Sequence, residues 1–419
     1  MNDLLKSPTI ITTIIITLLC SLLFIYMFYQ QLSRKDSDVS KMKKNLAATK
    51  KDREKIISIN DVSKPKKDPY NNNLFDKKIN HYSLRDCYVL SSYNSCCGGL
   101  FSNDYVSLEA LDNVLRHGAR FVDFEVYYKD NKPVVSAARN EFQTREYNLY
   151  NHLDLKDVLN YCVKAFEPEV APNHKDPLFI NIRIRSQNSK FYCKLVDVIQ
   201  NSRINDSSYR DYGYQNDSYE NNFGDSVLEK LNRKVFIFCD DPNNVIDKLT
   251  VTKNNETQAV KSLDLCTIKN NKENKKNLEF FCGNTLFELI TLKSNTQYLG
   301  KLNNYDVLYG KPSHDPVTTV ENNKLHLTIS TCSVDKGNGN VDFDKHAEYG
   351  IQFICLNFQK LDANFYNAYS KFVNYGSAFM IKAPEKRYKE IVVKIKKQDP
   401  KLSFAERHFA VPGGLAMKL

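Results

Sequence analysis

The feature that most limits the fold is a long uncharged stretch near the N-terminus. No residue between Ser7 and Ser33 is charged, and the segment from Ile10 to Tyr29 is almost wholly apolar. About 20 apolar residues are what one helix needs to cross a hydrocarbon layer of about 30 Å. The sequence therefore predicts a membrane anchor over residues 1–33, with the transmembrane span from Ile10 to Tyr29.

The residues on either side of this span indicate whether it is cleaved or retained, and which way it is oriented. A cleaved signal peptide would have a shorter apolar centre and a small-residue cleavage site, whereas Tyr-Gln-Gln-Leu follows here at 29–32, which favours a retained anchor over a cleaved signal. Lys6 stands alone before the span, and five basic residues follow it: Arg34, Lys35, Lys41, Lys43 and Lys44. Because basic flanks favour the cytoplasmic side, we expect a single-pass protein with a cytoplasmic body.

Two other features bear on the compartment. Sequons begin at Asn205, Asn216 and Asn255, and they matter only if the body is lumenal or extracellular. The 11 cysteines show no C-x-x-C pair and no zinc-like Cys/His spacing. Their odd number and their scatter favour buried free thiols in a reducing compartment over a disulfide framework.

Composition and turn residues divide the rest of the chain. The content of 42% apolar and 26% charged residues is ordinary for a globular protein. The net charge of +10 is concentrated partly near the N-terminus and partly at 267–277, which fits either a solvated face or attraction to anionic lipids. We expect no nucleic-acid partner. Polar residues with Pro65 and Pro69 predict a stalk and linker over residues 34–80.

Beyond the linker, short apolar runs alternate with helical stretches. Strands are expected at 88–92, 121–127, 178–185 and 235–239, and helices at 107–117, 155–166 and 191–200. After a polar insertion at 241–300, strand-like runs resume at 325–330, 351–356 and 378–381. This order predicts a parallel sheet, either in an α/β barrel or in a doubly wound sheet. The two halves would span 81–240 and 301–390, followed by a tail at 391–419.

Two of the predicted strands carry charges on one face. Asp123 and Glu125 alternate with apolar residues in the second strand, and Asn181, Arg183 and Arg185 oppose isoleucines in the third. If the apolar faces meet outer helices, the acids and the arginines share the interior of the sheet near a strand end. Burying one sign of charge without the other is costly, so we expect these groups to pair.

These segments resemble a known family. Residues 88–94, 107–110 and 118–125 (Tyr-Val-Leu-Ser-Ser-Tyr-Asn, Ser-Leu-Glu-Ala and Gly-Ala-Arg-Phe-Val-Asp-Phe-Glu) resemble the X region of phosphoinositide-specific phospholipase C. Residues 349–359 and 374–384 resemble its Y region. The resemblance implies a distorted TIM barrel, with the insertion where that family has a linker between its two barrel halves.

The resemblance also implies that the catalytic residues are replaced. That family uses one histidine to stabilise the phosphate, a second to protonate the leaving group, and calcium held by an Asn, a Glu-x-Asp pair and a further Glu. Here Tyr93 takes the place of the first histidine, and Ala137 takes the place of the second. Neither a phenol nor a methyl group can do the acid–base work of imidazole at neutral pH.

The expected calcium site is changed as well. Asn94 is kept, Asp123 and Glu125 form the acidic pair in reversed order, and Arg183 takes the place of the remaining Glu. A guanidinium there would repel a divalent cation and could pair with both acids. We therefore expect no metal and no cofactor; Ca²⁺ would be needed only if the barrel were active.

Three interpretations follow. The leading one is a membrane-anchored phospholipase C-like pseudoenzyme with a structural, scaffolding or interaction role, whose protein partners the sequence does not name. The second is a divergent phosphodiesterase acting on phosphatidylinositol lipids through Tyr93, Arg183, Arg185 or Arg139. The third is non-hydrolytic capture of an anionic lipid headgroup by Arg183 and Arg185, against which a salt-bridged Arg183 would count.

Overall fold

The computed structural model describes residues 8–62, 78–138, 146–211, 222–242, 285–294, 298–303, 323–332 and 339–389, with a few single positions between them and two short strands near the C-terminus. The chain divides into one unit from Met1 to Arg387 and another from Tyr388 to Leu419. In the second unit, β12 (His408–Ala410) pairs in antiparallel fashion with β13 (Ala416–Lys418). The tail expected at 391–419 falls within this unit.

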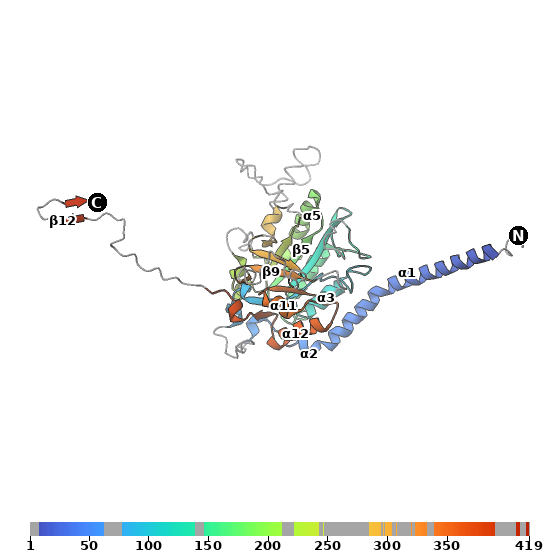
Figure 1. The fold of residues 1–419 in the computed structure, drawn as a ribbon, viewed down its shortest axis with the longest axis horizontal. Coiled ribbons are helices and arrows are strands. Elements are labelled where there is room, and N and C mark those ends of the chain that lie inside the picture. Colours follow the sequence, from blue (N-terminus) through green and yellow to red (C-terminus); the bar gives the residue numbers. More distant parts are fainter. Residues whose placement is uncertain are drawn as a thin grey trace, which may run out of the picture. The chain divides into compact units, whose positions relative to one another are not determined.

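The first unit is built on eight parallel strands in the spatial order β7-β6-β5-β2-β1-β10-β9-β8 (Figure 1). Their bounds are β1 Cys87–Ser92, β2 Phe121–Lys129, β5 Leu178–Ile184, β6 Val235–Asp240, β7 Leu292–Lys293, β8 Leu299–Asn303, β9 Leu327–Thr331 and β10 Phe353–Leu356. The sheet is a nearly closed barrel whose two edges are β7 and β8. The predicted TIM-like barrel is confirmed, and the doubly wound alternative is excluded.

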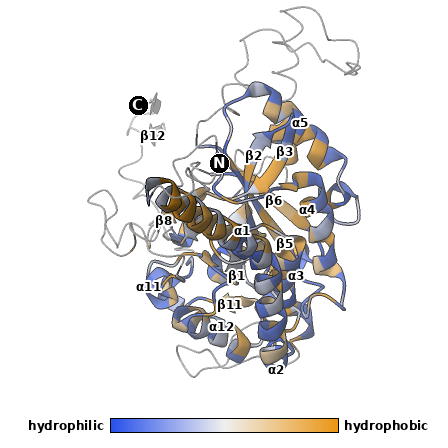
Figure 2. Ribbon diagram, turned by 90° about the vertical axis from the view of Figure 1, so that its right-hand side faces the viewer, coloured by the Kyte–Doolittle hydropathy of each residue, from blue (hydrophilic) through white to orange (hydrophobic). Residues whose placement is uncertain are grey.

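Helices cover the outside of the barrel (Figure 2). They are α3 (Leu108–Arg116), α4 (Leu155–Cys162), α5 (Ser189–Gln200), α11 (Phe343–Glu348) and α12 (Ala363–Tyr375). Local chemistry sets their ends: the Ser107 side chain accepts a hydrogen bond from the Ala110 N–H at the start of α3, and α12 ends at Gly376, whose φ of 77° is left-handed. The sequence did not predict α11 and α12.

Three short strands lie outside the parallel path. β11 (Phe379–Ile381) was predicted as a strand but runs antiparallel to β1, so it is no member of the parallel barrel. β3 (Lys132–Ser136) and β4 (Leu153–Asp154) extend the sheet from β2 in antiparallel fashion. The β2–β3 hairpin turns at Asp130 and Asn131, both at positive φ.

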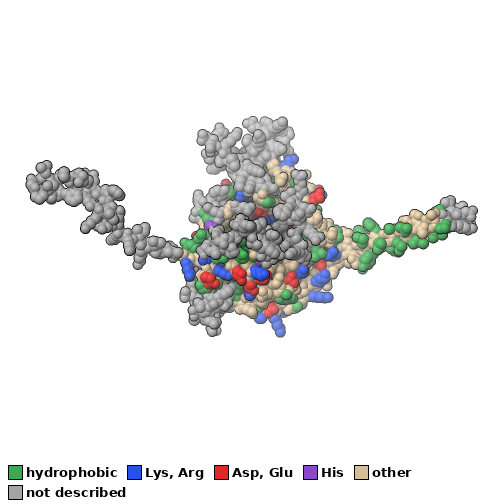
Figure 3. Space-filling model, viewed as in Figure 1, with side chains coloured by type: hydrophobic (Ala, Val, Ile, Leu, Met, Phe, Trp, Pro, Cys, Tyr) green, Lys and Arg blue, Asp and Glu red, His purple; other side chains and the backbone are tan. Residues whose placement is uncertain are grey.

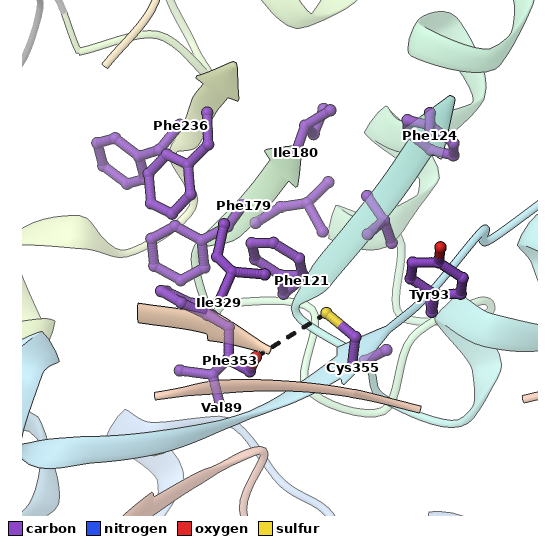
Figure 4. Packing of buried hydrophobic residues seen from close by; sticks show 14 of the residues in the cluster. Val89, Tyr93, Phe121, Phe124, Phe179, Ile180, Phe236, Ile329, Phe353 and Cys355 are labelled. Carbon is purple, nitrogen blue, oxygen red and sulfur yellow. Dashed lines mark hydrogen bonds between the residues drawn. The ribbon is translucent and has the colours of Figure 1, made fainter. Parts of the chain in front are cut away.

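Phenylalanine rings fill the amino-terminal end of the barrel interior. The ring centroid of Phe353 lies 4.7 Å from that of Phe121 and 5.5 Å from that of Phe179. Phe179 also stacks on Phe236 at 5.7 Å, and Figure 4 shows these side chains together with Val89 and Ile329. Since inward positions recur every second residue, the next inward layer on β2 and β5 begins with Asp123 and Asn181. The aromatic layer is therefore the floor beneath the polar side chains.

One helix of the described chain is long and apolar enough to span a membrane. Helix α1 (Pro8–Ala48) has 41 residues and a mean hydropathy of 2.5 over its most apolar window, none of which is buried. Apolar side chains are exposed along it (Figure 3). The expected span from Ile10 to Tyr29 lies within this helix.

The polar stalk expected at 34–80 needs correction. α1 continues unbroken to Ala48, α2 (Lys50–Arg53) follows, and Met42, Ile56 and Ile59 are buried. The Ile59 N–H donates to the buried carboxylate of Asp176 at 2.7 Å. These buried apolar side chains pack on the barrel, so residues 38–62 belong to its fold. Residues 63–77 lie outside the described residues.

The predicted insertion at 241–300 is also too long at its C-terminal end. Most of it lies outside the described residues, but β7 and the first two residues of β8 fall inside the predicted range. The second half of the barrel therefore begins at or before Leu292. A two-residue strand is too short for its periodicity to be visible in the sequence.

The cysteines partly contradict the expectation of free thiols. Within the described residues eight cysteines are free, and all of these except Cys20 are buried. Cys193 in α5 is disulfide-bonded, and the other cysteine of the bond lies outside the described residues. A persistent disulfide is typical of an oxidising compartment.

A buried lysine gives the fold a pH dependence. Lys382 follows β11 and is fully buried, with its Nζ donating to the Asn323 carbonyl at 3.3 Å. Burial lowers the pKa of Lys382 to about 7. The unfolded chain therefore binds more protons than the folded one between about pH 7 and the ordinary lysine pKa of about 10.4, so stability rises with pH in that window.

We predict that Lys382→Met removes this rise and increases the free energy of unfolding at pH 7 by on the order of 2 kcal/mol, because the cost of burying an ammonium group disappears. Urea unfolding of the full chain in detergent at several pH values between 6 and 10 measures both effects. The exposed Lys156→Met is the control and should keep the wild-type slope. An unchanged slope in Lys382→Met would refute the assignment.

Candidate functional site

The polar layer lies at the carboxyl ends of three neighbouring strands. Tyr93 and Asn94 directly follow β1, Asp123 and Glu125 lie on β2, and Arg183 lies on β5 opposite Glu125 in the parallel register. All five side chains are at most 2% exposed. Asn94 has a φ of 42°, a conformation that asparagine adopts more readily than most residues, and it turns the chain over the end of the barrel.

Arg183 is the centre of this layer. Its Nε and Nη2 donate to the two carboxylate oxygens of Asp123 at 2.9 and 2.8 Å, and its Nη1 donates to Glu125 Oε1 at 2.5 Å. Nη2 also donates to Asn94 Oδ1 at 2.5 Å. Nη1 lies 3.3 Å from the Tyr93 hydroxyl, and the guanidinium carbon lies 4.5 Å from the Tyr93 ring centroid. The predicted pairing of Arg183 with both acids is present.

Other groups hold the two carboxylates in place. Asp123 accepts hydrogen bonds from the Asn94 N–H at 3.0 Å and from the Asn181 amide at 2.8 Å. Glu125 Oε2 accepts from the Tyr127 hydroxyl at 2.7 Å and from the Ala138 N–H at 3.0 Å. Tyr127 stands two residues after Glu125, on the same strand face, so the period of two could have identified it; nothing local in the sequence points to the Ala138 N–H.

The electrostatics keep the layer charged. Burial alone would raise the pKa of Glu125, but Arg183 first, and then Arg185, Tyr127 and the Ala138 N–H, lower it to about 2. Burial would lower the pKa of Arg183, yet Asp123 in particular raises it well above its ordinary value. Two acids and two arginines balance in charge. Glu125 and Arg183 therefore form an internal salt bridge in which both partners stay charged.

The residues of this layer do not fit calcium. Ca²⁺ takes six to eight oxygen ligands, and here the oxygens of Asn94, Asp123 and Glu125 already accept hydrogen bonds from one guanidinium. A cation at the same place would be repelled by the positive charge of Arg183. Among the described residues, no group of three or more His, Cys, Asp or Glu side chains is arranged to hold a metal ion.

The remaining predicted site residues are less central. Ala137 is buried just after β3, beside the Ala138 N–H that binds Glu125. Arg185 is 4% exposed; its Nη2 lies 3.3 Å from Glu125 Oε1, and its Nε has no hydrogen-bond partner among the described residues. Arg139 lies outside the described residues. Of the sequon asparagines, Asn205 is partly exposed, and Asn216 and Asn255 lie outside the described residues.

A second ion pair at the same end of the barrel was missed by sequence reasoning. Asp240, at the end of β6, accepts a hydrogen bond from Lys301 of β8 at 2.8 Å. Burial raises the pKa of Asp240, but Lys301 outweighs it and the pKa is lowered. The neighbouring Asp241 accepts from the Tyr192 hydroxyl at 3.1 Å. Because β8 is not visible in the sequence pattern, Lys301 had no predicted place.

Solved structures of phospholipase C resemble this chain. Against PLC21 from L. pealei the TM-score is 0.51 at 15% identity, covering 74% of this chain and 38% of that one. Against PLC21 from S. officinalis the TM-score is 0.49 at 16% identity, covering 74% and 38%. A calcium-dependent phosphoinositol-specific phospholipase C from Pseudomonas gives 0.37 at 11% identity, covering 68% and 95%.

The comparison with PLC21 from L. pealei supports the fold. The chain spans well under half the length of the two PLC21 chains. No family model matches the sequence, and no curated protein matches it either. The resemblance in structure is therefore one of architecture: a nearly closed parallel barrel of the type found in phosphoinositide phospholipases C.

We predict that Arg183→Met destabilises the protein by about 3–5 kcal/mol, because it leaves Asp123 buried without its counter-charge and Glu125 with Arg185 alone. Urea unfolding at pH 7 measures the loss. The double variant Arg183→Met, Asp123→Asn removes one charge of each sign, leaves Glu125 paired with Arg185, and should recover most of the stability. A loss below about 1 kcal/mol in the single variant would show that water reaches the acids.

Proposed function

We propose that this protein is a membrane-anchored, phospholipase C-like pseudoenzyme that serves a structural, scaffolding or interaction role. The observation that carries the proposal is Arg183, a fixed positive charge bound to Asp123, Glu125 and Asn94. By the resemblance of the sequence, these residues stand where the family holds calcium. The Arg183 side chain supplies the positive charge permanently. It also occupies the oxygens that would bind calcium, so no metal ion is held there to activate a substrate hydroxyl.

The acid–base groups support the same proposal. Tyr93 is fully buried with its hydroxyl beside Arg183, so it reaches no substrate, and Ala137 has no group that transfers a proton. General acid–base catalysis typically contributes 10²- to 10⁴-fold to a rate, and positioned charge at the transition state contributes more. A barrel without these contributions would hydrolyse phosphodiesters at a negligible rate.

Lipid headgroup capture is the second candidate. It is favoured by Arg185, whose Nε has no hydrogen-bond partner among the described residues although the side chain is almost wholly buried. The salt bridges of Arg183 count against it, since that guanidinium already binds two carboxylates. Sedimentation with vesicles, with and without phosphatidylinositol 4,5-bisphosphate, distinguishes this candidate: binding that depends on the lipid and is lost in Arg185→Gln would favour it.

Catalysis and metal binding can be tested with one residue. We expect no release of inositol phosphate by the wild-type chain, with or without calcium. Arg183→Glu replaces the cation by a third carboxylate and should create a calcium site: millimolar Ca²⁺ should raise the unfolding temperature of Arg183→Glu and leave the wild type unchanged.

The neutral variant Arg183→Gln is the matched control, because it removes the guanidinium without adding a carboxylate, and its response to calcium should be weak. Lipid turnover by the wild type that is abolished in Arg183→Gln would overturn the pseudoenzyme proposal in favour of a divergent phosphodiesterase. Stabilisation of the wild type by calcium would overturn the proposed substitution of the metal by Arg183.

Membrane attachment is assigned to α1, and the basic residues after its apolar part favour a cytoplasmic barrel. A persistent Cys193 disulfide would contradict a cytoplasmic location of the barrel, because the cytosol keeps thiols reduced. We expect protease added to the cytosolic face of sealed vesicles to digest the barrel, and Asn205→Gln to leave the electrophoretic mobility unchanged. Protection of the barrel together with a glycosidase-sensitive band would place it on the opposite side.

A further inference from the structure

The polar half of α1 meets the loop between β1 and α3 through two buried carboxyl groups. Asp38, shortly after the uncharged segment, is 8% exposed, and Asp104 in the loop is 1% exposed. They meet at Gly98 and Gly99 of the same loop. We call these four residues the joint, because they connect the membrane helix to the end of the barrel that carries the polar layer.

The glycines bring the two carboxyl groups together. A Cβ on Gly99 would stand 2.9 Å from Asp104 Oδ2 and 3.3 Å from Asp38 Oδ2, and a Cβ on Gly98 would stand 3.4 Å from Asp38 Oδ2. Both carboxyl groups therefore approach one glycine, and no side chain fits between them and the backbone of the loop.

One buried carboxyl oxygen of the joint has no hydrogen-bond donor among the described residues. Asp104 accepts from the N–H groups of Tyr105 at 2.8 Å and Leu100 at 2.7 Å, which fix its orientation. Asp38 Oδ1 accepts from Lys41 at 3.3 Å, but the buried Asp38 Oδ2 has no hydrogen-bond partner among the described residues. A buried oxygen without a donor is costly, and a proton carried by the Asp104 carboxyl group would supply the missing donor.

Other charged and titratable groups face the pair from both sides. On α1, Arg34 Nε lies 3.8 Å from Asp104 Oδ2; Arg34 is partly exposed and Lys41 is largely exposed, so solvent screens both. The loop contributes the buried Cys97 thiol, and the Tyr105 ring contacts Tyr150.

Proton affinity at the joint is correspondingly high. Burial first, and then the charge and hydrogen bond of Asp38, raise the pKa of Asp104 to about 6, although the Leu100 N–H opposes this. Arg34 and Lys41 are partly screened by solvent, so they do not remove this preference of Asp104 for a proton.

We propose that Asp104 carries a proton toward Asp38 when α1 is docked, and that this proton couples the docking of α1 on the barrel to pH. Because the proton binds more tightly when α1 is docked, its contribution is fully present below about pH 4, the ordinary range of an aspartate, and is lost as the pH rises through about 6. When undocked, the short polar end of α1 would fray, since an isolated helix of this length is marginal in water.

Hydrogen exchange of the full chain in lipid nanodiscs tests this coupling. Protection factors of peptides covering 39–48 and 98–106, corrected for the intrinsic chemical rate, should fall roughly tenfold between pH 5 and pH 7.5. Asp38→Asn keeps a hydrogen-bond donor toward Asp104 at every pH, so its protection should stay high at both pH values. Asp104→Asn should likewise lose the pH dependence.

Asp36→Asn is the matched control, because it makes the same change of charge on an exposed position of the same helix. It should keep the wild-type pH dependence. Near-ultraviolet circular dichroism checks that each variant is folded. The proposal is overturned if the wild type shows no pH dependence, if Asp38→Asn retains the tenfold fall, or if Asp38→Asn is unprotected at both pH values.

Discussion

The salt bridge of Arg183 with Asp123 and Glu125 is the interaction on which the polar end of the barrel depends. Two carboxylates buried above a floor of phenylalanine rings would be prohibitively costly without a counter-charge. Arg183 pairs with both and, together with Arg185, balances their charge; it also positions Asn94 and Tyr93, which follow β1. The register of β1, β2 and β5 and the position of the first loop are thereby connected through a single side chain.

Under the pseudoenzyme proposal, this arrangement takes the place of an exchangeable ion. A site that depends on an exchangeable ion must stay open enough for that ion and a substrate to enter. Arg183 is covalently attached, so the same acids can be closed off completely, and they are at most 1% exposed. This end of the barrel is closed to solvent, which is compatible with the proposed role of a protein that binds partners by its surface.

The period of two along the strands predicted a parallel sheet and the pairing of its charges, and the resemblance of the sequence to phospholipase C favoured a barrel over a doubly wound sheet. The period placed Asp123, Glu125 and Arg183 on inward faces before any contact was known. What it could not predict are contacts made by distant segments: the packing of residues 38–62 on α3 and its neighbours, the Lys301–Asp240 pair, and the antiparallel direction of β11. Strands of two or three residues show no periodicity, and packing between remote segments has no local signature.

Helix α1 has no glycine, and its only proline is its first residue, so it carries no internal hinge between Pro8 and Ala48. A rigid rod of this kind transmits rotation. A thicker or thinner bilayer changes the tilt of a spanning helix to match its hydrophobic length. With α1 as the proposed membrane anchor and the joint closed, such a change in lipid thickness would turn the whole barrel with the helix, so bilayer thickness would set the orientation of the surface that the barrel presents.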